Sequence, residues 1–438
     1  MEIDKTTLND LAIFDAEDEF SIFNFIDETK TSNGKEQLKR NLRTPLTSIE
    51  QVTGIQETLK LIIQQKGSWP SRISNGSIIV VERFYDSNID LIPANVSSFT
   101  AYSYKLLHGP DYSLVKYSVS HCFDVIKGMQ ELTAAYLNDE CPSPLKNLLV
   151  EAKKITAHEQ FKLIAANSKA ADIDIPQMLQ LAHFILYKFK SNMKSLLNIH
   201  AQLDAWFGMA MAVQKHQLVF PQFIISAQPF IDAEGLYHLL LKQAVAYNVL
   251  MNRDTNFLFL TGANMAGKST FIKSVGSAVF LAHIGMGVPA KKMQLSLFDG
   301  LLSNINVIDN IAKGESYFFN EVQRIKSTIT KVNDGRKWLI LIDELFKGTN
   351  VQDAMKCSTA VIEGLLKIKN SLFILSTHLY EIAEALKVQP NISFNYFETT
   401  VDGDQLNFNY QLRKGISNDR LGYLILKKEG VVKMLEEL

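Results

Sequence analysis

The residue types between Gly262 and Thr270 could bind the phosphates of a nucleotide. This stretch fits the pattern G-x-x-x-x-G-K-[ST] and follows an apolar run, residues 256–260, that is typical of a buried strand. In such a loop, backbone N–H groups and the start of the next helix bind phosphate oxygens because both carry partial positive charge. We expect Lys268 to neutralise the β- and γ-phosphates and Ser269 to hold Mg²⁺. The expected nucleotide-binding residues of the loop are Gly262, Ala263, Asn264, Met265, Ala266, Gly267, Lys268, Ser269 and Thr270.

Two adjacent acids, Asp343 and Glu344, end an apolar run that begins at Trp338. Neighbouring carboxylates rarely end a buried strand unless a cation lies nearby. Asp343 is suited to binding Mg²⁺ directly or in its second shell. Glu344 faces the opposite way and is suited to being the base that orients the attacking water. Many strands end in Asp-Glu for solubility alone, but the position of this pair after the lysine loop favours the catalytic interpretation.

His378 follows a third apolar run, residues 372–376. A single histidine at such a place is often only a packed or capping residue. Its position after a third buried strand favours a different interpretation, a sensor of the γ-phosphate. The expected catalytic residues are therefore Glu344 and His378.

A further element, from Gly314 to Glu321, lies between the lysine loop and the acidic strand. ABC-type ATPases have an element at this place in the chain, whereas RecA-like ATPases and small GTPases do not. In ABC-type enzymes a serine at a helix N-terminus meets the γ-phosphate bound to the other subunit. Gly314 and Ser316 could form such a signature in trans, which would make the working unit a homodimer. Ser316 could equally be a simple helix N-cap.

The elements that must position these residues differ between the two halves of the chain. Only seven of the 22 glycines precede residue 215, and glycine is unfavourable inside helices. The first half has apolar residues at helical spacing, including an unbroken pattern from Met178 to about His216 that predicts one continuous helix. The second half alternates apolar runs with helical stretches and ends in a hairpin pattern. We expect an all-helical domain over residues 1–215 and an ABC-type α/β P-loop ATPase domain over residues 216–438.

Bulk composition excludes several classes of protein. The 438 residues are 47% hydrophobic and 21% charged, with a net charge of −1, so neither a disordered chain nor a basic arm is indicated. Cys122, Cys141 and Cys357 are isolated, which argues against structural zinc and disulfides and favours a reducing cytoplasm. The polar, acidic start is unlike a signal peptide, and the stretch 274–290 is just short of a membrane span. We expect a soluble, cytoplasmic protein.

Taken together, TGANMAGKST, GESYFFNEV, LILIDELFKGTN and STH resemble the ATPase domain of the MutS mismatch repair family. The Asn264-Met265 pair and Thr270 are more specific to that family than the generic loop. Upstream, the sequences AEGLYH and AYN resemble the family's segment leading into the nucleotide site, which implies a nucleotide contact for Asn248. KGISNDRLG near the C-terminus resembles a family segment as well, and residues 27–46 resemble the start of its helical lever domain.

The resemblance implies a dimeric, Mg²⁺-dependent ATPase that engages duplex or branched DNA with weak sequence specificity, in mismatch repair or recombination. Because the chain begins where the lever domain begins, we expect a short member without the mismatch-recognition and connector domains. The family's reading motif there is Phe-x-Glu. Phe319-Asn-Glu321 matches it but lies inside the signature element, so we expect no direct reading of mismatches.

Two departures from the family pattern bear on the site. Ala266 stands where the family usually has glycine, which puts nucleotide affinity in question. Phe346 and Lys347 stand where it usually has Gly-Arg, which puts communication between subunits in question. The alternative function is a cytosolic ABC-type ATPase subunit of another complex that does not act on DNA. The absence of a Leu-Ser-Gly-Gly-Gln sequence argues against it.

Overall fold

The computed structural model describes residues 1–14, 20–306, 317–402, 405–417, 426–427 and 430–436. The chain forms two compact units. One comprises residues 1–25, 44–52 and 216–438, and the other comprises residues 26–43 and 53–215. These units differ from the expected ranges 1–215 and 216–438, because the first residues of the chain pack with its second half.

The reason for this difference is a strand at the N-terminus. Strand β1 (Glu2–Ile3) pairs in parallel with β7 (Gly300–Asn304), and α1 (Lys5–Asp10) contacts the same strand. The ammonium group of Met1 donates a hydrogen bond to the carbonyl of Leu46, which belongs to the same unit. Periodicity along the sequence does not report such pairings between distant segments.

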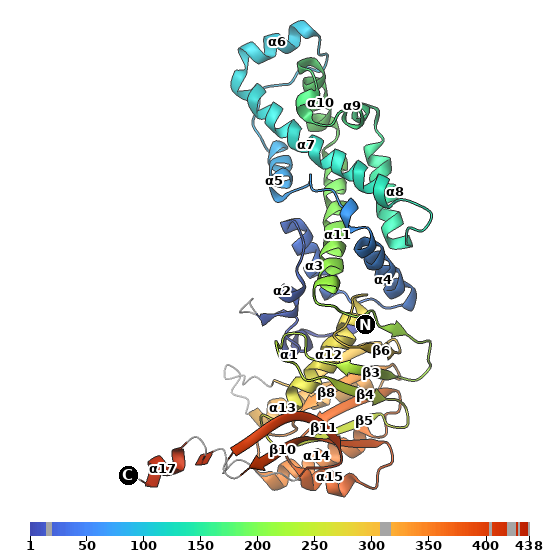
Figure 1. Cartoon of the computed structure of the whole chain (residues 1–438), viewed down its shortest axis with the longest axis vertical. Helices are drawn as coiled ribbons and strands as arrows, with labels where there is room; N and C mark the ends of the chain where they lie inside the picture. The colour runs from blue at the N-terminus through green and yellow to red at the C-terminus, as the bar shows by residue number, and fades with distance from the viewer. Residues whose placement is uncertain (15–19, 307–316, 403–404, 418–425, 428–429, 437–438) are drawn as a thin grey trace. The chain divides into compact units, whose positions relative to one another are not determined.

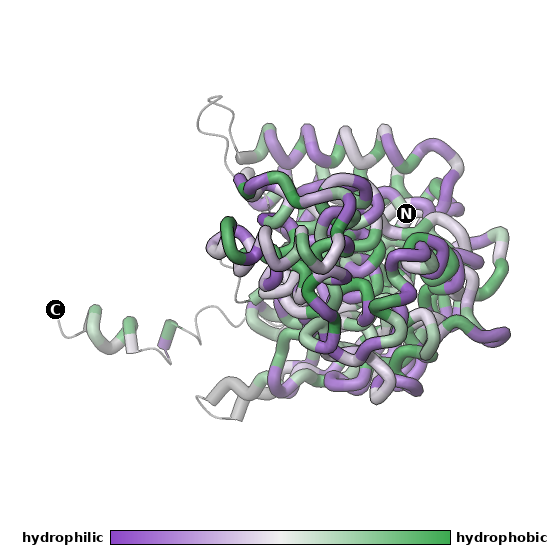
Figure 2. Tube along the Cα trace, turned by 90° about the horizontal axis from the view of Figure 1, so that it is seen from above, coloured by the Kyte–Doolittle hydropathy of each residue, from purple (hydrophilic) through white to green (hydrophobic). Residues whose placement is uncertain are grey.

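The second unit is helical (Figure 1). Hydrophobic and hydrophilic residues alternate along much of the trace in Figure 2, as expected of helices that bury one side and expose the other. Its α-helices are α3 (Ser32–Arg43), most of α4 (Ile49–Gln64), α5 (Asn75–Phe84), α6 (Ser98–Leu107), α7 (Gly109–Tyr136), α8 (Ser143–Thr156), α9 (Lys162–Ala166), α10 (Ile175–Lys188) and α11 (Lys190–Lys215). The short helix α2 (Ile22–Ile26) precedes them.

The apolar pattern from Met178 to about His216 forms two helices, and the expectation of one continuous helix is wrong. Helix α10 ends at Lys188 because the φ of −115° and ψ of 4° of Phe189 leave the helical range, and α11 begins at Lys190. The Phe189 ring is 1% exposed and lies edge-on to Phe161, with ring centroids 4.7 Å apart. Burial of this ring accompanies the break, and both segments keep the same apolar periodicity.

The first unit contains a seven-stranded sheet in the order β1-β7-β8-β9-β5-β10-β11. Neighbouring strands run parallel from β1 through β7, β8, β9 and β5 to β10. In this sheet only the last strand, β11, is antiparallel to its neighbour. Besides β1 and β7, the sheet contains β5 (Phe257–Thr261), β8 (Trp338–Asp343), β9 (Ser371–Ser376), β10 (Ile392–Asp402) and β11 (Gln405–Lys414). The three apolar runs and the hairpin therefore form strands where the sequence predicts them.

Helices cover both faces of this sheet, which is why β5, β8 and β9 are buried along their whole length. Alternate strand residues such as Phe259, Ile340 and Phe373 share one core with the helices of one face. These are α13 (Tyr317–Val332), α14 (Val351–Leu365) and α15 (Tyr380–Leu386). Helix α12 (Lys268–His283) packs on β8 and β9 from the other side.

A smaller sheet in the order β2-β6-β3-β4 completes the unit. Its strands are β2 (Gln222–Phe223), β6 (Lys292–Leu295), β3 (Ile231–Leu236) and β4 (Tyr247–Met251), and a last helix, α17, spans Val431–Glu436. In the large sheet the carboxyl ends of β5, β9 and β8 are adjacent, so the segments following them meet at one edge. Among the described residues, no helix has the length and apolar character needed to cross a membrane.

Candidate nucleotide site

The loop between β5 and α12 has the backbone of a phosphate-binding loop. Gly262 and Gly267 adopt φ angles of 133° and 107°, which side chains other than glycine rarely tolerate. Gly267 directly precedes α12, so the first N–H groups of that helix are exposed to the loop. Ala266 is 2% exposed and its N–H donates to the carbonyl of Ala263, so the extra methyl group is accommodated inside the loop.

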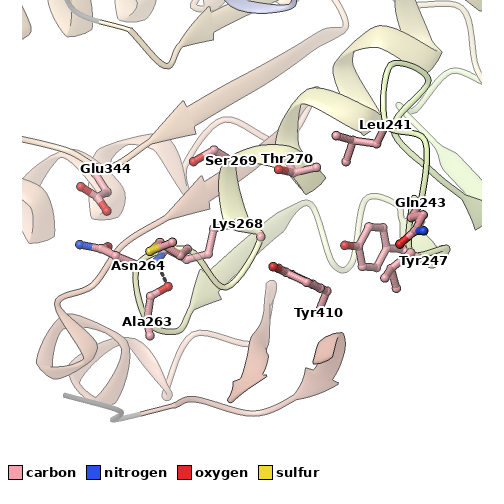
Figure 3. Close-up of a pocket in the computed structure, with 13 residues that line it drawn as sticks. Leu241, Gln243, Tyr247, Ala263, Asn264, Lys268, Ser269, Thr270, Glu344 and Tyr410 are labelled. Atoms are coloured by element: carbon pink, nitrogen blue, oxygen red, sulfur yellow. Dashed lines mark hydrogen bonds between the residues drawn. The ribbon is translucent and has the colours of Figure 1, made fainter. Parts of the chain in front are cut away.

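A cavity of about 460 Å³ opens over this loop. Figure 3 shows Lys268 in its middle, with Glu344 towards one end and Tyr247 towards the other. The volume lies within the usual range for small-molecule sites. The loop residues that line the cavity are Ala263, Asn264, Met265, Gly267, Lys268, Ser269 and Thr270.

The amine of Lys268 satisfies its hydrogen bonds within the loop. Its Nζ donates to the carbonyls of Gly262 at 2.7 Å and Ala263 at 2.9 Å. The side chain is 5% exposed, and burial lowers the pKa of this amine against the opposing charges of Glu344 and Asp343. A buried cation that rests on neutral carbonyls has capacity for an anionic partner.

Asp343 joins the strand ends to the loop. Its Oδ2 accepts a hydrogen bond from the hydroxyl of Ser269 at 2.5 Å, and its Oδ1 accepts one from the hydroxyl of Ser376. Among the described residues no basic side chain forms an ion pair with this 8% exposed carboxylate. The two residues expected to hold Mg²⁺, Ser269 and Asp343, are thus in direct contact, and their oxygen atoms are ligands that Mg²⁺ prefers.

Glu344 lies at a strained turn directly after β8. Its φ of 65° is left-handed, a conformation that is uncommon for residues other than glycine and that clusters at functional sites. Its carboxylate lies 3.6 Å from Nδ1 of His378 and 3.4 Å from Nζ of Lys347. Burial raises the pKa of Glu344, but the hydrogen bond from His378 and the positive charges of Lys347 and Lys268 outweigh it, so the pKa falls to about 2.

The other end of the cavity is lined by Leu241, Gln243, Val245, Tyr247 and Tyr410. Sequence reasoning missed these residues. Tyr247 is the neighbour of Asn248, which was expected to contact the nucleotide, and successive side chains of a strand point to opposite faces. Asn248 does not line the cavity; its Oδ1 accepts a hydrogen bond from the N–H of Gly235 on the adjacent strand. Tyr247 lines the cavity in its place, and a nucleotide contact of Asn248 stays a prediction.

Gly314 and Ser316, the expected signature residues, lie outside the described residues. The helix that follows them, α13, is described, and it contacts the segment that follows Glu344. Glu321 on α13 is 5% exposed, and its two carboxylate oxygens accept hydrogen bonds from the N–H groups of Lys347 and Gly348, at 3.1 and 3.2 Å. No sequence motif reports this contact, because the donors are backbone groups.

The residues that depart from the family pattern take part in the same contact region. The ring of Phe346 is 4% exposed and packs against Phe318 of α13, with centroids 5.7 Å apart. Lys347 forms the ion pair with Glu344 described above. The segment after the acidic pair is therefore held by α13 on one side and by the carboxylate of Glu344 on the other.

Comparisons with known proteins agree with this geometry. Residues 258–435 match the family model of MutS domain V. Among similar proteins, the DNA mismatch repair protein MutS of Carboxydothermus hydrogenoformans is 26% identical over 303 residues, which are 67% of this chain and 35% of that protein. The DNA mismatch repair protein spellchecker 1 of Drosophila melanogaster is 29% identical over 255 residues, 56% of this chain and 28% of that protein. The chain thus spans about a third of the length of the relatives it matches.

Proposed function

Because this chain belongs to the MutS family, we propose that it is a Mg²⁺-dependent ATPase that couples ATP binding and hydrolysis to the engagement of DNA. The observation that carries the ATPase proposal is one cavity lined by Lys268, Ser269 and Glu344, with Asp343 bonded to Ser269. The proposal for DNA rests on the family and on the names of its relatives. We also propose that the unit containing this cavity is an ABC-type P-loop ATPase domain.

Phosphate binding follows from the chemistry of the loop. The β- and γ-phosphates would replace the loop carbonyls as partners of Lys268, and a charged partner stabilises a buried amine more than a neutral one does. The N–H groups at the start of α12 would bind the remaining oxygens. Ser269 and Asp343 would hold Mg²⁺, which neutralises charge that develops on the transferred phosphoryl group. The apolar and aromatic end of the cavity, with Tyr247 and Tyr410, would accept the base.

Glu344 is the residue we assign to the attacking water. Its carboxylate is ionised at neutral pH, and His378 and Lys347 fix its two oxygens in place. A carboxylate with a pKa of about 2 accepts a proton poorly, so in the free chain it suits orientation of water better than abstraction of its proton. A bound nucleotide would bring negative charge and engage Lys268, and both changes would raise the pKa of Glu344.

Two substitutions separate binding from hydrolysis. Lys268→Ala should weaken binding of a fluorescent ATP analogue by at least about tenfold, because the charge at the phosphates is lost. Glu344→Gln should retain that binding and lower the hydrolysis rate by a factor on the order of 10²–10⁴, since an amide holds water but is not basic. Wild-type turnover by Glu344→Gln would refute the assigned role.

We further propose that the working unit is a homodimer with shared nucleotide sites. The segment containing Gly314 and Ser316 would contact the γ-phosphate bound to the partner chain, and ATP would bridge the two chains. Glu321 supports this arrangement, because it connects the helix after that segment to the loop after the chain's own Glu344. Each chain could then couple the state of its own nucleotide site to the partner chain's site, which its Gly314 and Ser316 would complete.

A further inference from the structure

A lysine outside the lining of the nucleotide cavity contacts the carboxylate at one end of it. Nζ of Lys347 lies 3.4 Å from Oε2 of Glu344, and Nδ1 of His378 lies 3.6 Å from Oε1. Among the described residues, these two side chains are the only ones that can carry positive charge within ion-pair distance of this carboxylate. Glu344 itself lines the cavity. Lys347 is therefore separated from the cavity by a single side chain.

The backbone that carries Lys347 is held in place, whereas its amine is not. The N–H of Lys347 donates a hydrogen bond to the buried carboxylate of Glu321 at 3.1 Å. The preceding residue, Phe346, is buried against Phe318. The Lys347 side chain is 35% exposed and ends in an ammonium group on a flexible four-carbon stem. The ammonium group can thus change partners while the backbone stays fixed.

The charge of Lys347 also acts on the phosphate loop. Burial lowers the pKa of the Lys268 amine, the charges of Glu344 and Asp343 raise it, and the charge of Lys347 lowers it further. Figure 3 shows Lys268 in the middle of the cavity and Glu344 towards one end. An anion placed beyond Lys268, on the side of Glu344, would lie close to both amines.

The third phosphate of a nucleotide would occupy that place. With its base at the end lined by Tyr247 and Tyr410, a nucleotide would extend its phosphates past Lys268 towards Glu344, and only a triphosphate would reach that far. The γ-phosphate would then face the carboxylate of Glu344, and like charges at short distance repel unless a cation lies beside them. Lys347 can supply this cation, because its ammonium group has three donors and the contact with Glu344 needs only one.

We propose that Lys347 binds the γ-phosphate and determines the preference of the site for a nucleoside triphosphate over a diphosphate. The inference rests on the proposed ATP site and adds to it a phosphate-binding residue from outside the phosphate loop. A diphosphate ends before it reaches Glu344, so it leaves Lys347 paired with that carboxylate alone, as it is in this structure.

The first test compares affinities for a triphosphate and a diphosphate. Binding of fluorescent analogues of ADP and of non-hydrolysable ATP is measured with Mg²⁺. Lys347→Gln should bind the triphosphate at least about tenfold more weakly, because a hydrogen bond between charged groups is lost, and ADP within about twofold of wild type. Lys347→Arg keeps the charge and should bind both nearly as wild type does. Lys356→Gln, at an exposed position on α14, is the matched control and should change neither affinity.

The second test asks whether Lys347 contacts the phosphate itself or acts through Glu344. Lys347→Gln is introduced into the Glu344→Gln chain, in which there is no carboxylate for the lysine to hold. Direct binding of the γ-phosphate predicts that triphosphate affinity falls there too, again by at least about tenfold. A lysine that only orients Glu344 would have no further effect in that chain.

Each outcome decides the matter. Selective loss of triphosphate affinity with and without the Glu344 carboxylate supports the inference, and the retained ADP affinity shows that the variants are folded. Unchanged triphosphate affinity, equal loss for both nucleotides, or loss only when the carboxylate is present overturns it, while the proposed ATP site stands. If Lys268→Ala binds the triphosphate as tightly as wild type does, the proposed site fails and the inference fails with it.

Discussion

At the scale of single residues, the site is held together by side chains that each bridge two segments. Asp343 connects β8 to the phosphate loop through Ser269, and Glu344 connects to His378 and Lys347. The phosphate loop and the acidic pair could be predicted from sequence, because their chemistry requires fixed residue types at fixed spacing. The contacts of Glu321 could not, since its partners are backbone N–H groups distant in sequence.

Glu321 provides a prediction at this scale. In Glu321→Gln only one oxygen remains to accept the N–H groups of Lys347 and Gly348, and the charge is lost. We expect the turnover number for ATP to fall roughly tenfold, since a hydrogen bond to a charged group contributes about 1.5–3 kcal/mol, and nucleotide affinity to stay nearly unchanged. Glu363→Gln, an exposed position on neighbouring α14, is the matched control. Equal turnover in both variants would show that Glu321 does not contribute to ATP hydrolysis.

At the scale of elements, strands were easier to predict than helix ends. Strands β5, β8 and β9 are buried on both faces, so their sequences are continuous apolar runs that predict buried strands. The break at Phe189 could not be predicted from the sequence, because α10 and α11 share one apolar periodicity. A motif likewise identified strand β4 but not which of its side chains lines the cavity: Tyr247 does, whereas Asn248 bonds to Gly235.

Helix α12, which starts at the phosphate loop, ends in a histidine with a fixed tautomer. The Nδ1–H of His283 donates to the carbonyl of Val279 at 2.8 Å, and its Nε2 accepts from the N–H of Phe298 at 2.9 Å. The imidazole is 0% exposed, and burial lowers its pKa to about 3. The folded chain therefore keeps His283 neutral in the range where an unfolded chain protonates it.

This difference predicts how stability depends on pH. The unfolded pKa is about 6.5, so below that value the unfolded state binds a proton that the folded state refuses, and the free energy of unfolding falls. The contribution of His283 approaches about 1.4 kcal/mol per pH unit between pH 6 and 4 and ends near the folded value. Urea unfolding of wild type and His283→Gln at several pH values measures it. The variant should be less stable at pH 7 but show a smaller slope; equal slopes would contradict the assignment.

At the scale of the whole molecule, the two units do not follow the division that composition suggests. The glycine content changes near residue 215, but the first residues of the chain complete the large sheet of the first unit. Pairing of β1 with β7 joins segments almost 300 residues apart, and two strand residues give no detectable period. The sequence predicts the phosphate loop and Glu344, which line the cavity, whereas the unit that contains them extends further than predicted.

The Phe-x-Glu sequence bears on the proposed recognition of DNA by the whole molecule. In Phe319-Asn-Glu321 the glutamate is buried and bonded to its own chain, so it cannot reach a base. We expect a single mismatch to improve affinity over perfect duplex by less than about tenfold, or ~1.4 kcal/mol. Affinity should also fall with rising salt, as phosphate contacts require. A competition titration with labelled duplexes measures both, and a strong mismatch preference would contradict the prediction.

The central claim, an ATPase of the MutS type coupled to DNA, is tested most directly by one measurement. The steady-state ATPase rate of the full chain is compared without DNA and with perfect, mismatched and branched duplexes, alongside the Lys268→Ala variant. The account predicts that at least one DNA changes the wild-type rate by about fivefold or more, the size of typical coupling between sites, and that Lys268→Ala loses the activity. A wild-type rate that is the same with every DNA would contradict the account and favour an ATPase subunit that does not act on DNA.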